Sequence, residues 1–204
     1  MPTAEKCGYA GIYNRFFKRI FDFIAALILS VLLLPVVIVF SIMIAIEDGL
    51  PVFYTPLRGG YKGKAFRIFK FRTMVKNADK IGGGTTALND PRITRSGAFL
   101  RKVKGDEIVQ IYNVLIGNMS FVGPRPEVAD YVDLYTPYQR QVLQVRPGIT
   151  GLASIRFRNE NELPTASDDP NRTYIEQVMP KKIELDLEYS PHASDSYDLK
   201  LIYK

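Results

Sequence analysis

The stretch FIAALILSVLLLPVVIVFSIMIAI, residues 23–46, contains no charged side chain, and it decides which kind of fold the chain can adopt. At about 1.5 Å per residue, a straight helix of this length could cross a bilayer core of about 30 Å. A core helix in a chain of 204 residues would rarely be apolar on every face. The stretch therefore predicts a membrane-inserted helix. Glu47-Asp48-Gly49 follows it in place of a small-residue cleavage site, so it is not typical of a cleavable signal.

Pro35 lies in the middle of this stretch and predicts a break in the helix. A proline lacks a backbone donor and clashes with the carbonyl four residues earlier, here that of Val31. Ser30 is near enough for its hydroxyl to satisfy the freed carbonyl within lipid. The sequence thus predicts two helical segments that meet at a bend near Pro35.

Charged residues on both sides of the stretch bear on its topology. Lys18, Arg19 and Asp22 precede it, and a basic segment that includes Lys70 and Arg72 follows it. By the positive-inside rule, both flanks are typical of the cytoplasmic side. A helix that enters the membrane, bends at Pro35 and leaves on the same side would keep both flanks in the cytoplasm. A kinked helix that spans the membrane is the ordinary alternative. The residues alone leave both topologies open.

The rest of the chain predicts a mainly helical region with one small β-hairpin. Aromatic and branched residues at Val52–Tyr54 and Ala65–Phe71 flank a glycine-rich turn, as in a hairpin. Helical patterns follow at Thr94–Lys104, from Gly105, at Glu127–Val145 with an interruption at Thr136-Pro137, and at Tyr174–Tyr189 with a division at Pro180. Gly123-Pro124-Arg125-Pro126 predicts a rigid loop, and Arg146 to Gly151 a tight turn. We expect an α+β fold with a membrane-associated part at 1–48 and a catalytic region at 49–204, in one continuous domain.

Composition limits the chemistry that this chain can perform. The single cysteine, Cys7, excludes an intramolecular disulfide framework, and the single histidine, His192, excludes a histidine-rich metal centre. Any catalysis must therefore use carboxylates, Lys, Arg, hydroxyls or a hard metal ion. The formal net charge of +6 indicates an anionic partner such as a membrane surface, a nucleic acid or a phosphorylated substrate.

Asp106-Glu107 is the most informative pair of carboxylates. Both lie in the first turn of a predicted helix, where the helix dipole favours the ionised form. An ionised Asp can be a nucleophile or a ligand of Mg²⁺, although acidic residues are common in the first turn of any helix. The surrounding sequence is basic and includes Lys70, Arg72, Arg101, Arg125 and Arg146. Together with a membrane segment, this pattern indicates phosphoryl transfer at a membrane surface.

Five motifs give the chain a family resemblance that covers about Arg15 to Leu201. In chain order they are Phe17-Lys18-Arg19-Ile20-Phe21-Asp22, Phe69-Lys70-Phe71-Arg72-Thr73-Met74, Asp106-Glu107, NVLIGNMSFVGPRP at 113–126, and Arg146-Pro147-Gly148-Ile149-Thr150-Gly151. With them, the chain resembles the bacterial sugar transferases called small monotopic phosphoglycosyl transferases. The long motif at 113–126 is highly specific. One departure is Lys104-Gly105, where the family usually has Ser-Leu before the Asp-Glu pair.

The resemblance implies an activity, a topology and a set of site residues. A phospho-sugar would move from a UDP-sugar to a polyprenyl phosphate with release of UMP, the first membrane step of glycoconjugate assembly. The helix broken at Pro35 would be re-entrant, with the active site on the cytoplasmic face of the bacterial inner membrane. Later glycosyltransferases of the same pathway would be partners.

The implied roles fall on particular residues. Asp106 would be the nucleophile and would bind the cofactor Mg²⁺, with Glu107 beside it. The family's substrate-binding positions would fall on Arg72, Arg101, Arg125 and Asp186, and the basic context adds Lys70 and Arg146 as candidates. The membrane part would depend on Lys18, Arg19, Asp22 and Pro35.

Two other function classes remain at this stage. A membrane-anchored basic adaptor without catalysis would not need Asp106. A nucleic-acid-binding domain on an anchor would need one basic block, whereas the Arg residues here are dispersed and next to Pro and Gly turns. We therefore expect no nucleic-acid partner.

Overall fold

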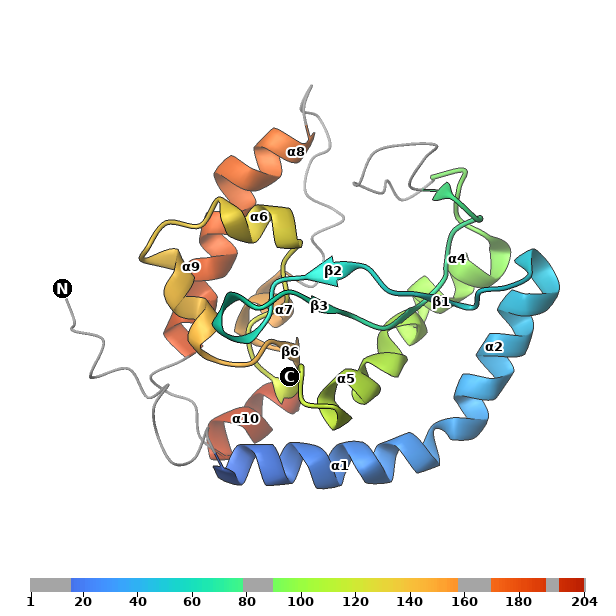
Figure 1. Ribbon diagram of the computed structural model, residues 1–204, viewed down its shortest axis with the longest axis horizontal. Helices are drawn as coiled ribbons and strands as arrows, with labels where there is room; N and C mark the ends of the chain where they lie inside the picture. The colour runs from blue at the N-terminus through green and yellow to red at the C-terminus, as the bar shows by residue number, and fades with distance from the viewer. Residues whose placement is uncertain (1–15, 79–89, 158–169, 190–194, 204) are drawn as a thin grey trace.

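The computed structural model describes residues 16–78, 90–157, 170–189 and 195–203 (Figure 1). Cys7 and His192 lie outside these residues. Helix α1 (Lys18–Leu32) runs along one side of the molecule, and α2 (Leu34–Asp48) turns away from it at 58°. Within the described residues no single helix is long and apolar enough to cross a membrane, whereas this bent pair meets the length and composition test jointly.

The predicted break near Pro35 is confirmed. Pro35 occupies the first turn of α2, where a missing backbone donor costs no intrahelical hydrogen bond. The expectation for Ser30 is wrong, because its hydroxyl donates to the carbonyl of Leu27 at 2.8 Å and not to that of Val31. One helix ends at Leu32 and the next begins at Leu34. The Val31 carbonyl therefore does not need a hydrogen bond from this hydroxyl.

The first helix is attached to the rest of the molecule by its charged residues. Lys18 is paired with Asp198 of α10 (Asp195–Ile202). Arg19 donates to the carbonyls of Val114 and Leu115 at 2.6 and 3.0 Å, at the end of α5 (Ile111–Leu115). The side chains predicted to lie at the membrane thus point into the protein and hold α1 against it.

Asp22 makes the third attachment of α1. Its Oδ1 accepts from the backbone N–H of Phe121 at 3.2 Å, in strand β5 (Ser120–Val122). The side chain is 3 % exposed. The polar side chains of α1 are therefore turned inward, and most of its large apolar side chains are exposed.

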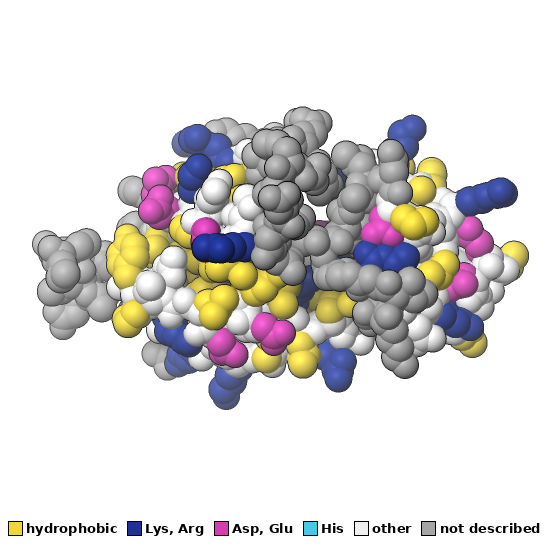
Figure 2. Space-filling model, turned by 90° about the horizontal axis from the view of Figure 1, so that it is seen from above, with side chains coloured by type: hydrophobic (Ala, Val, Ile, Leu, Met, Phe, Trp, Pro, Cys, Tyr) yellow, Lys and Arg dark blue, Asp and Glu magenta, His cyan; other side chains and the backbone are white. Residues whose placement is uncertain are grey.

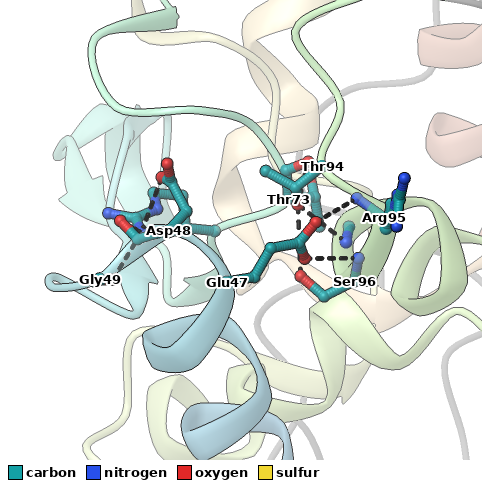
Figure 3. A network of polar contacts seen from close by, with 9 residues as sticks. Glu47, Asp48, Gly49, Thr73, Thr94, Arg95 and Ser96 are labelled. Atoms are coloured by element: carbon teal, nitrogen blue, oxygen red, sulfur yellow. Dashed lines mark hydrogen bonds and ion pairs between the residues drawn. The ribbon is translucent and has the colours of Figure 1, made fainter.

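The end of α2 is attached at a second place, shown in Figure 3. The two carboxylate oxygens of Glu47 accept from the backbone N–H groups of Arg95 and Ser96, each at 2.8 Å. These groups open α4 (Arg95–Lys102), whose N-cap is Thr94. Negative charge at a helix N-terminus is favourable, so this contact fixes α2 to α4.

The predicted hairpin is confirmed, with a break in its pairing. Strand β1 (Phe53–Tyr54) pairs with β4 (Lys70–Phe71), and β2 (Leu57–Arg58) pairs with β3 (Phe66–Arg67), both antiparallel. The short helix η4 (Tyr61–Gly63) forms the tip.

A parallel pair, β5 with β6 (Gly148–Thr150), was not predicted. It joins the predicted rigid loop to the predicted tight turn. A Cβ at Gly148 would lie 2.1 Å from the backbone N of Gly123, so this close approach requires glycine.

The remaining predicted helices form with different boundaries. The pattern from Gly105 gives η5 (Gly105–Gln110) and then α5, and that at Glu127–Val145 gives α6 (Ala129–Asp133) and η6 (Gln139–Gln144). Helices α7 (Leu152–Arg156) and α8 (Pro170–Thr173) were not predicted. The division at Pro180 is wrong, because the π-helical turn η8 (Tyr174–Val178) leads without a break into α9 (Met179–Tyr189). A π-turn just before a proline accommodates its missing donor.

Apolar side chains between the bent helix pair and the hairpin form the core that supports the site. One cluster contains Ala26 of α1 with Val114 and Met119, and another contains Val37 and Ile44 of α2 with other buried residues, namely Phe71, Leu100 and Val109. The hairpin and η5 therefore pack directly on the N-terminal helices.

Loss of the Lys18 charge is expected to destabilise the protein. Lys18 and Asp198 are 8 % and 7 % exposed, and Tyr189 Oη donates to Asp198 Oδ1 at 2.6 Å. We expect Lys18→Met to lower the free energy of unfolding by about 3 kcal/mol, because it leaves a buried carboxylate without its counter-charge. Lys18→Met with Asp198→Asn should lose less. Thermal unfolding in detergent measures both, and a double variant less stable than the single one would contradict the prediction.

Candidate active site

A cavity of about 1500 Å³ brings most of the predicted site residues together. Its walls come from the hairpin, α4, η5, the loop after β5, α7 and α9. The predicted residues on these walls are Lys70, Arg72, Arg101, Asp106, Glu107, Arg125 and Asp186. These side chains come from segments far apart in the sequence, so the fold assembles one site from the separate motifs.

The cavity wall is strongly basic. It contains nine Lys or Arg residues against four Asp or Glu residues. A concave surface with this balance concentrates anions. Figure 2 views the molecule from above Figure 1, and on this side Lys and Arg side chains are dispersed among Asp and Glu.

Asp106 lies in the first turn of η5, where the sequence predicted a helix start. Lys104, in a left-handed conformation with φ of 55°, turns the chain between α4 and η5. Gly105 is buried, and a Cβ there would lie 3.0 Å from the ring of Phe40 in α2. The glycine therefore lets the start of η5 pack closely against α2.

The carboxylate of Asp106 forms no ion pair with the described residues. Burial raises its pKa above the usual aspartate value, and the negative charge of Glu107 raises it further. Lys70 and Arg101 act in the opposite direction. Asp106 is thus a half-buried carboxylate that faces a basic cavity without a fixed counter-ion.

Glu107, in contrast, is held between two cations. Lys70 Nζ lies 2.7 Å and Arg125 Nη2 lies 2.5 Å from its Oε1, while Arg125 Nη1 lies 3.2 Å from Oε2. Burial alone would raise the pKa of Glu107, but Arg125 and Lys70 lower it well below the usual range. Glu107 therefore stays ionised and orients two cations beside Asp106.

Two arginines occupy the wall nearest the N-terminal helices. Arg72 Nη2 donates to the carbonyls of Asp48 and Gly49 at 3.1 and 2.7 Å and lies 3.0 Å from Asp48 Oδ2. Its Nε and Nη1 form no hydrogen bond with the described residues. Arg101 Nε donates to Thr73 Oγ1 at 2.9 Å. Arg72 thus joins the end of α2 to the cavity, and the terminal nitrogens of Arg101 form no hydrogen bond with the described residues.

Asp186 lines the cavity and is bonded to α7. Its Oδ1 accepts from Ala153 N at 3.4 Å. Burial raises the pKa of Asp186 to about 7, and the backbone N–H groups of Ala153 and Arg125 act in the opposite direction. The residue predicted to bind substrate thus lies in the cavity with its carboxylate against the start of α7.

The raised pKa of Asp186 makes stability depend on pH. The folded state binds this proton more tightly than the unfolded state, in which the pKa is about 3.9. The contribution to the free energy of unfolding is fully present below about pH 4 and is lost as the pH rises to about 7. We expect Asp186→Asn to remove this loss. The melting temperature of the variant, relative to that of the wild type at the same pH, should therefore increase from pH 4 to pH 7. Asp130→Asn, at an exposed carboxylate, is the control, and a constant difference across this range would contradict the prediction.

Arg146 is the predicted substrate-binding residue that does not line the cavity. Its Nε donates to the carbonyl of Gly117 at 3.0 Å, and its guanidinium lies 5.1 Å from the ring centroid of Tyr61. The position before Pro147-Gly148 thus serves to join the end of α5 to the hairpin tip.

Five cations of the cavity wall were not among the site residues predicted from the sequence. They are Arg58 of β2, Lys76, Arg92 before α4, Lys104 before η5 and Lys182 of α9. Arg92 is bonded to Asp90 at 2.6 Å, and Lys182 lies 5.0 Å from the ring centroid of Tyr174. No local motif marks these residues, because only the tertiary fold brings them to the cavity.

The donor set suits a magnesium ion that is bound mainly through substrate. Among the described residues there is no cluster of three or more His, Cys, Asp or Glu that could hold a metal. Mg²⁺, however, commonly uses one or two carboxylates together with phosphate oxygens and water. Asp106 offers such a carboxylate, whereas both oxygens of Glu107 are already bonded to cations.

Comparison with known proteins shows the family of this chain. The sequence model described as bacterial sugar transferase matches residues 13–204. The chain is 38% identical over 186 residues to the uncharacterized sugar transferase EpsL of Bacillus subtilis, covering 91% of this chain and 83% of EpsL. It is 34% identical over 202 residues to the exopolysaccharide production protein ExoY of Rhizobium meliloti, covering 92% and 82%.

A third relative is longer. The chain is 35% identical over 199 residues to the UDP-glucose:undecaprenyl-phosphate glucose-1-phosphate transferase of Escherichia coli, covering 93% of this chain but 39% of that protein. The family resemblance predicted from the motifs is confirmed, and the chain, a transferase, belongs to the bacterial sugar transferase family.

Proposed function

We propose that the protein transfers a phospho-sugar from a UDP-sugar to a polyprenyl phosphate and releases UMP. The observation that carries the proposal is that Asp106, which forms no ion pair with the described residues, lies in a basic cavity next to the Lys70–Glu107–Arg125 cluster. Both substrates are phosphate anions, and this wall can offset their charge. By its name, the relative from Escherichia coli acts on UDP-glucose and undecaprenyl phosphate.

In the first step, a carboxylate oxygen of Asp106 attacks the sugar-bearing phosphorus of the donor. The bond between this phosphorus and the bridging oxygen breaks, UMP leaves with that oxygen, and a phospho-sugar remains on Asp106. In the second step, an oxygen of the polyprenyl phosphate attacks the same phosphorus and restores the carboxylate. Neither step needs a histidine base, because both nucleophiles are anions.

The arginines and Lys70 bind and orient phosphate oxygens in both steps. Arg125 and Lys70 are placed by Glu107, and Arg101 faces the cavity from α4. Mg²⁺, held by Asp106 and the donor diphosphate, would supply further charge neutralisation.

We further propose that α1 and α2 form a re-entrant membrane hairpin on the cytoplasmic face of the inner membrane. The start of α1 is bonded to α10, α5 and β5, and the end of α2 to the β-hairpin and α4. Both ends thus attach to one polar folded region, which cannot lie on both sides of a bilayer. Each helix has 15 residues, about 22 Å, which is shorter than a bilayer core.

The surface of the helix pair supports insertion into lipid. Its outer side chains are large and apolar, and many are more than half exposed, for example Val31 at 66 %, Leu32 at 65 % and Ile46 at 81 %. Soluble proteins rarely expose apolar patches of this extent.

The topology can be tested with cysteines on both flanks. Cys7, the chain's single cysteine, precedes α1, and Lys62 is exposed at the hairpin tip beyond α2. We expect a membrane-impermeant maleimide to label Cys7, and Lys62→Cys in a Cys7→Ser background, in inverted vesicles but not in spheroplasts. Labelling of the two positions from opposite sides would show a spanning helix.

The activity is tested with purified protein, Mg²⁺, a panel of UDP-sugars and a polyprenyl phosphate, with UMP release as the measurement. We expect UMP to appear with at least one donor and only with active protein. A membrane-anchored adaptor would release none with any donor.

A further inference from the structure

Arg101 is held in the cavity by one hydrogen bond. Its Nε donates to Thr73 Oγ1 at 2.9 Å. Its terminal nitrogens form no hydrogen bond or ion pair with the described residues, and the side chain lines the cavity. Its charge also lowers the pKa of Asp106. The plane of this guanidinium therefore depends on Thr73.

Thr73 itself is rigidly placed. It is 8 % exposed, and its carbonyl accepts from Thr94 N at 3.1 Å. A Cβ at Gly97 would lie 2.0 Å from that carbonyl oxygen, so α4 approaches Thr73 as closely as glycine permits. On the other side, Arg72 N donates to Val52 O at 2.9 Å. The hydroxyl of Thr73 is thus a fixed point between the hairpin and α4.

The same residue is bonded to both ends of α4. Its carbonyl contacts Thr94, the N-cap, and its hydroxyl contacts Arg101 in the last turn. Figure 3 shows that Glu47 of α2 bonds the same helix start from the other direction. These contacts hold the backbone of α4, whereas the Arg101 side chain is bonded, among the described residues, to the Thr73 hydroxyl alone.

We propose that Thr73 is a positioning residue that fixes the Arg101 guanidinium so that its terminal nitrogens bind the diphosphate of the nucleotide donor. A hydrogen bond at Nε sets the plane of the guanidinium and leaves its terminal fork for a bidentate contact with phosphate. Ordering this side chain before binding also removes an entropic cost of binding. The inference rests on the proposed function, because it takes the ligand of the cavity to be a nucleoside diphosphate.

The test is the binding of UDP to the full chain in nanodiscs, measured by calorimetry without turnover. We expect Thr73→Val to weaken UDP binding roughly tenfold, as for loss of a hydrogen bond to a charged group, and Thr73→Ser to restore it to within about twofold. In an Arg101→Ala background, Thr73→Val should have no further effect, because the residue acts through Arg101. Thr55→Val, the same change in the hairpin outside the cavity lining, is the control.

Several results would overturn the inference. One is a loss of UDP affinity by Thr73→Val that adds fully to the loss caused by Arg101→Ala. Another is a wild-type protein that does not bind UDP. If Thr73→Val fails to fold, Thr73→Ser and Thr73→Ala give the same comparison, since they differ by one hydroxyl. Equal UDP affinities of that pair would also overturn it.

UMP release separates this inference from the proposed function. Additive effects in a protein that releases UMP refute the role of Thr73 alone. Coupled effects in a protein that releases no UMP refute the proposed transfer and leave the role of Thr73 in place.

Discussion

Replacing Asp106 by Asn is expected to lower UMP release at least about a thousandfold, because the amide cannot act as the nucleophile. Asn has nearly the same size, and the Asp106 carboxylate forms no ion pair with the described residues, so the fold should persist. Steady-state UMP release under saturating UDP-sugar measures the loss. Asp130→Asn removes an exposed carboxylate of α6 and should retain full activity.

A mass measurement makes this prediction specific to covalent chemistry. Wild-type protein, quenched after exposure to UDP-sugar without acceptor, should gain the mass of a phospho-sugar on the peptide that contains Asp106. The Asn variant should gain none. Undiminished UMP release by the variant, or product formation without any added mass at this peptide, would refute Asp106 as the nucleophile.

The sequence predicted the elements that depend on local patterns. The break at Pro35, the hairpin around residues 58–64 and the helix capped by Thr94 each follow from a proline, a glycine cluster or an apolar period. Pairing between strands far apart in the sequence is not marked by any such local pattern. Strands β5 and β6 have three residues each and meet only because Gly123 and Gly148 allow their backbones to touch.

The sequence predicted which residues form the site better than it predicted what each of them does. The family motifs and the basic context of the sequence together named seven residues that the cavity brings together, and they also named Arg146, which donates to the carbonyl of Gly117 and does not line the cavity. Asp186 was assigned to substrate, and in the structure its carboxylate also accepts a hydrogen bond from the backbone of Ala153, which no motif indicated. A motif identifies a residue type at a position, and only the packed structure determines which partner its side chain reaches.

The membrane residues illustrate the same limit. Lys18, Arg19 and Asp22 were interpreted through the charge asymmetry of the flanks, yet each side chain is bonded inside the protein. Their partners are about 90 to 180 residues later in the sequence, at Val114, Phe121 and Asp198. No local pattern contains that information.

Replacing Glu107 by Gln is expected to lower the rate of UMP release roughly a hundredfold, the order expected when groups that stabilise a transition-state charge lose their orientation. The Glu107 carboxylate accepts three hydrogen bonds from Lys70 and Arg125, and a neutral amide cannot hold both cations. Glu188→Gln removes the same charge from an exposed site on α9 and serves as the matched control.

The pH profile of this variant distinguishes its role from simple damage. The negative charge of Glu107 raises the pKa of Asp106. Glu107→Gln removes this charge and therefore lowers the pKa of the nucleophile. The wild type should lose activity as the pH falls through the raised pKa of Asp106, and the variant should retain its smaller activity to a lower pH.

The apparent pKa is best measured on the first half-reaction, the transfer from the donor to Asp106 without acceptor. In this range only the enzyme titrates, because the donor diphosphate stays ionised. The Asp186 carboxyl, with a pKa of about 7, titrates nearby, so the comparison is made in an Asp186→Asn background. A shift of the acid limb toward lower pH, together with a lower plateau, is the expected result. If Glu107 were instead a proton donor in catalysis, its loss would abolish activity without moving the limb that belongs to Asp106. An unchanged or raised apparent pKa of Asp106 in the variant would therefore contradict the role of Glu107 as the ionised carboxylate that binds Lys70 and Arg125.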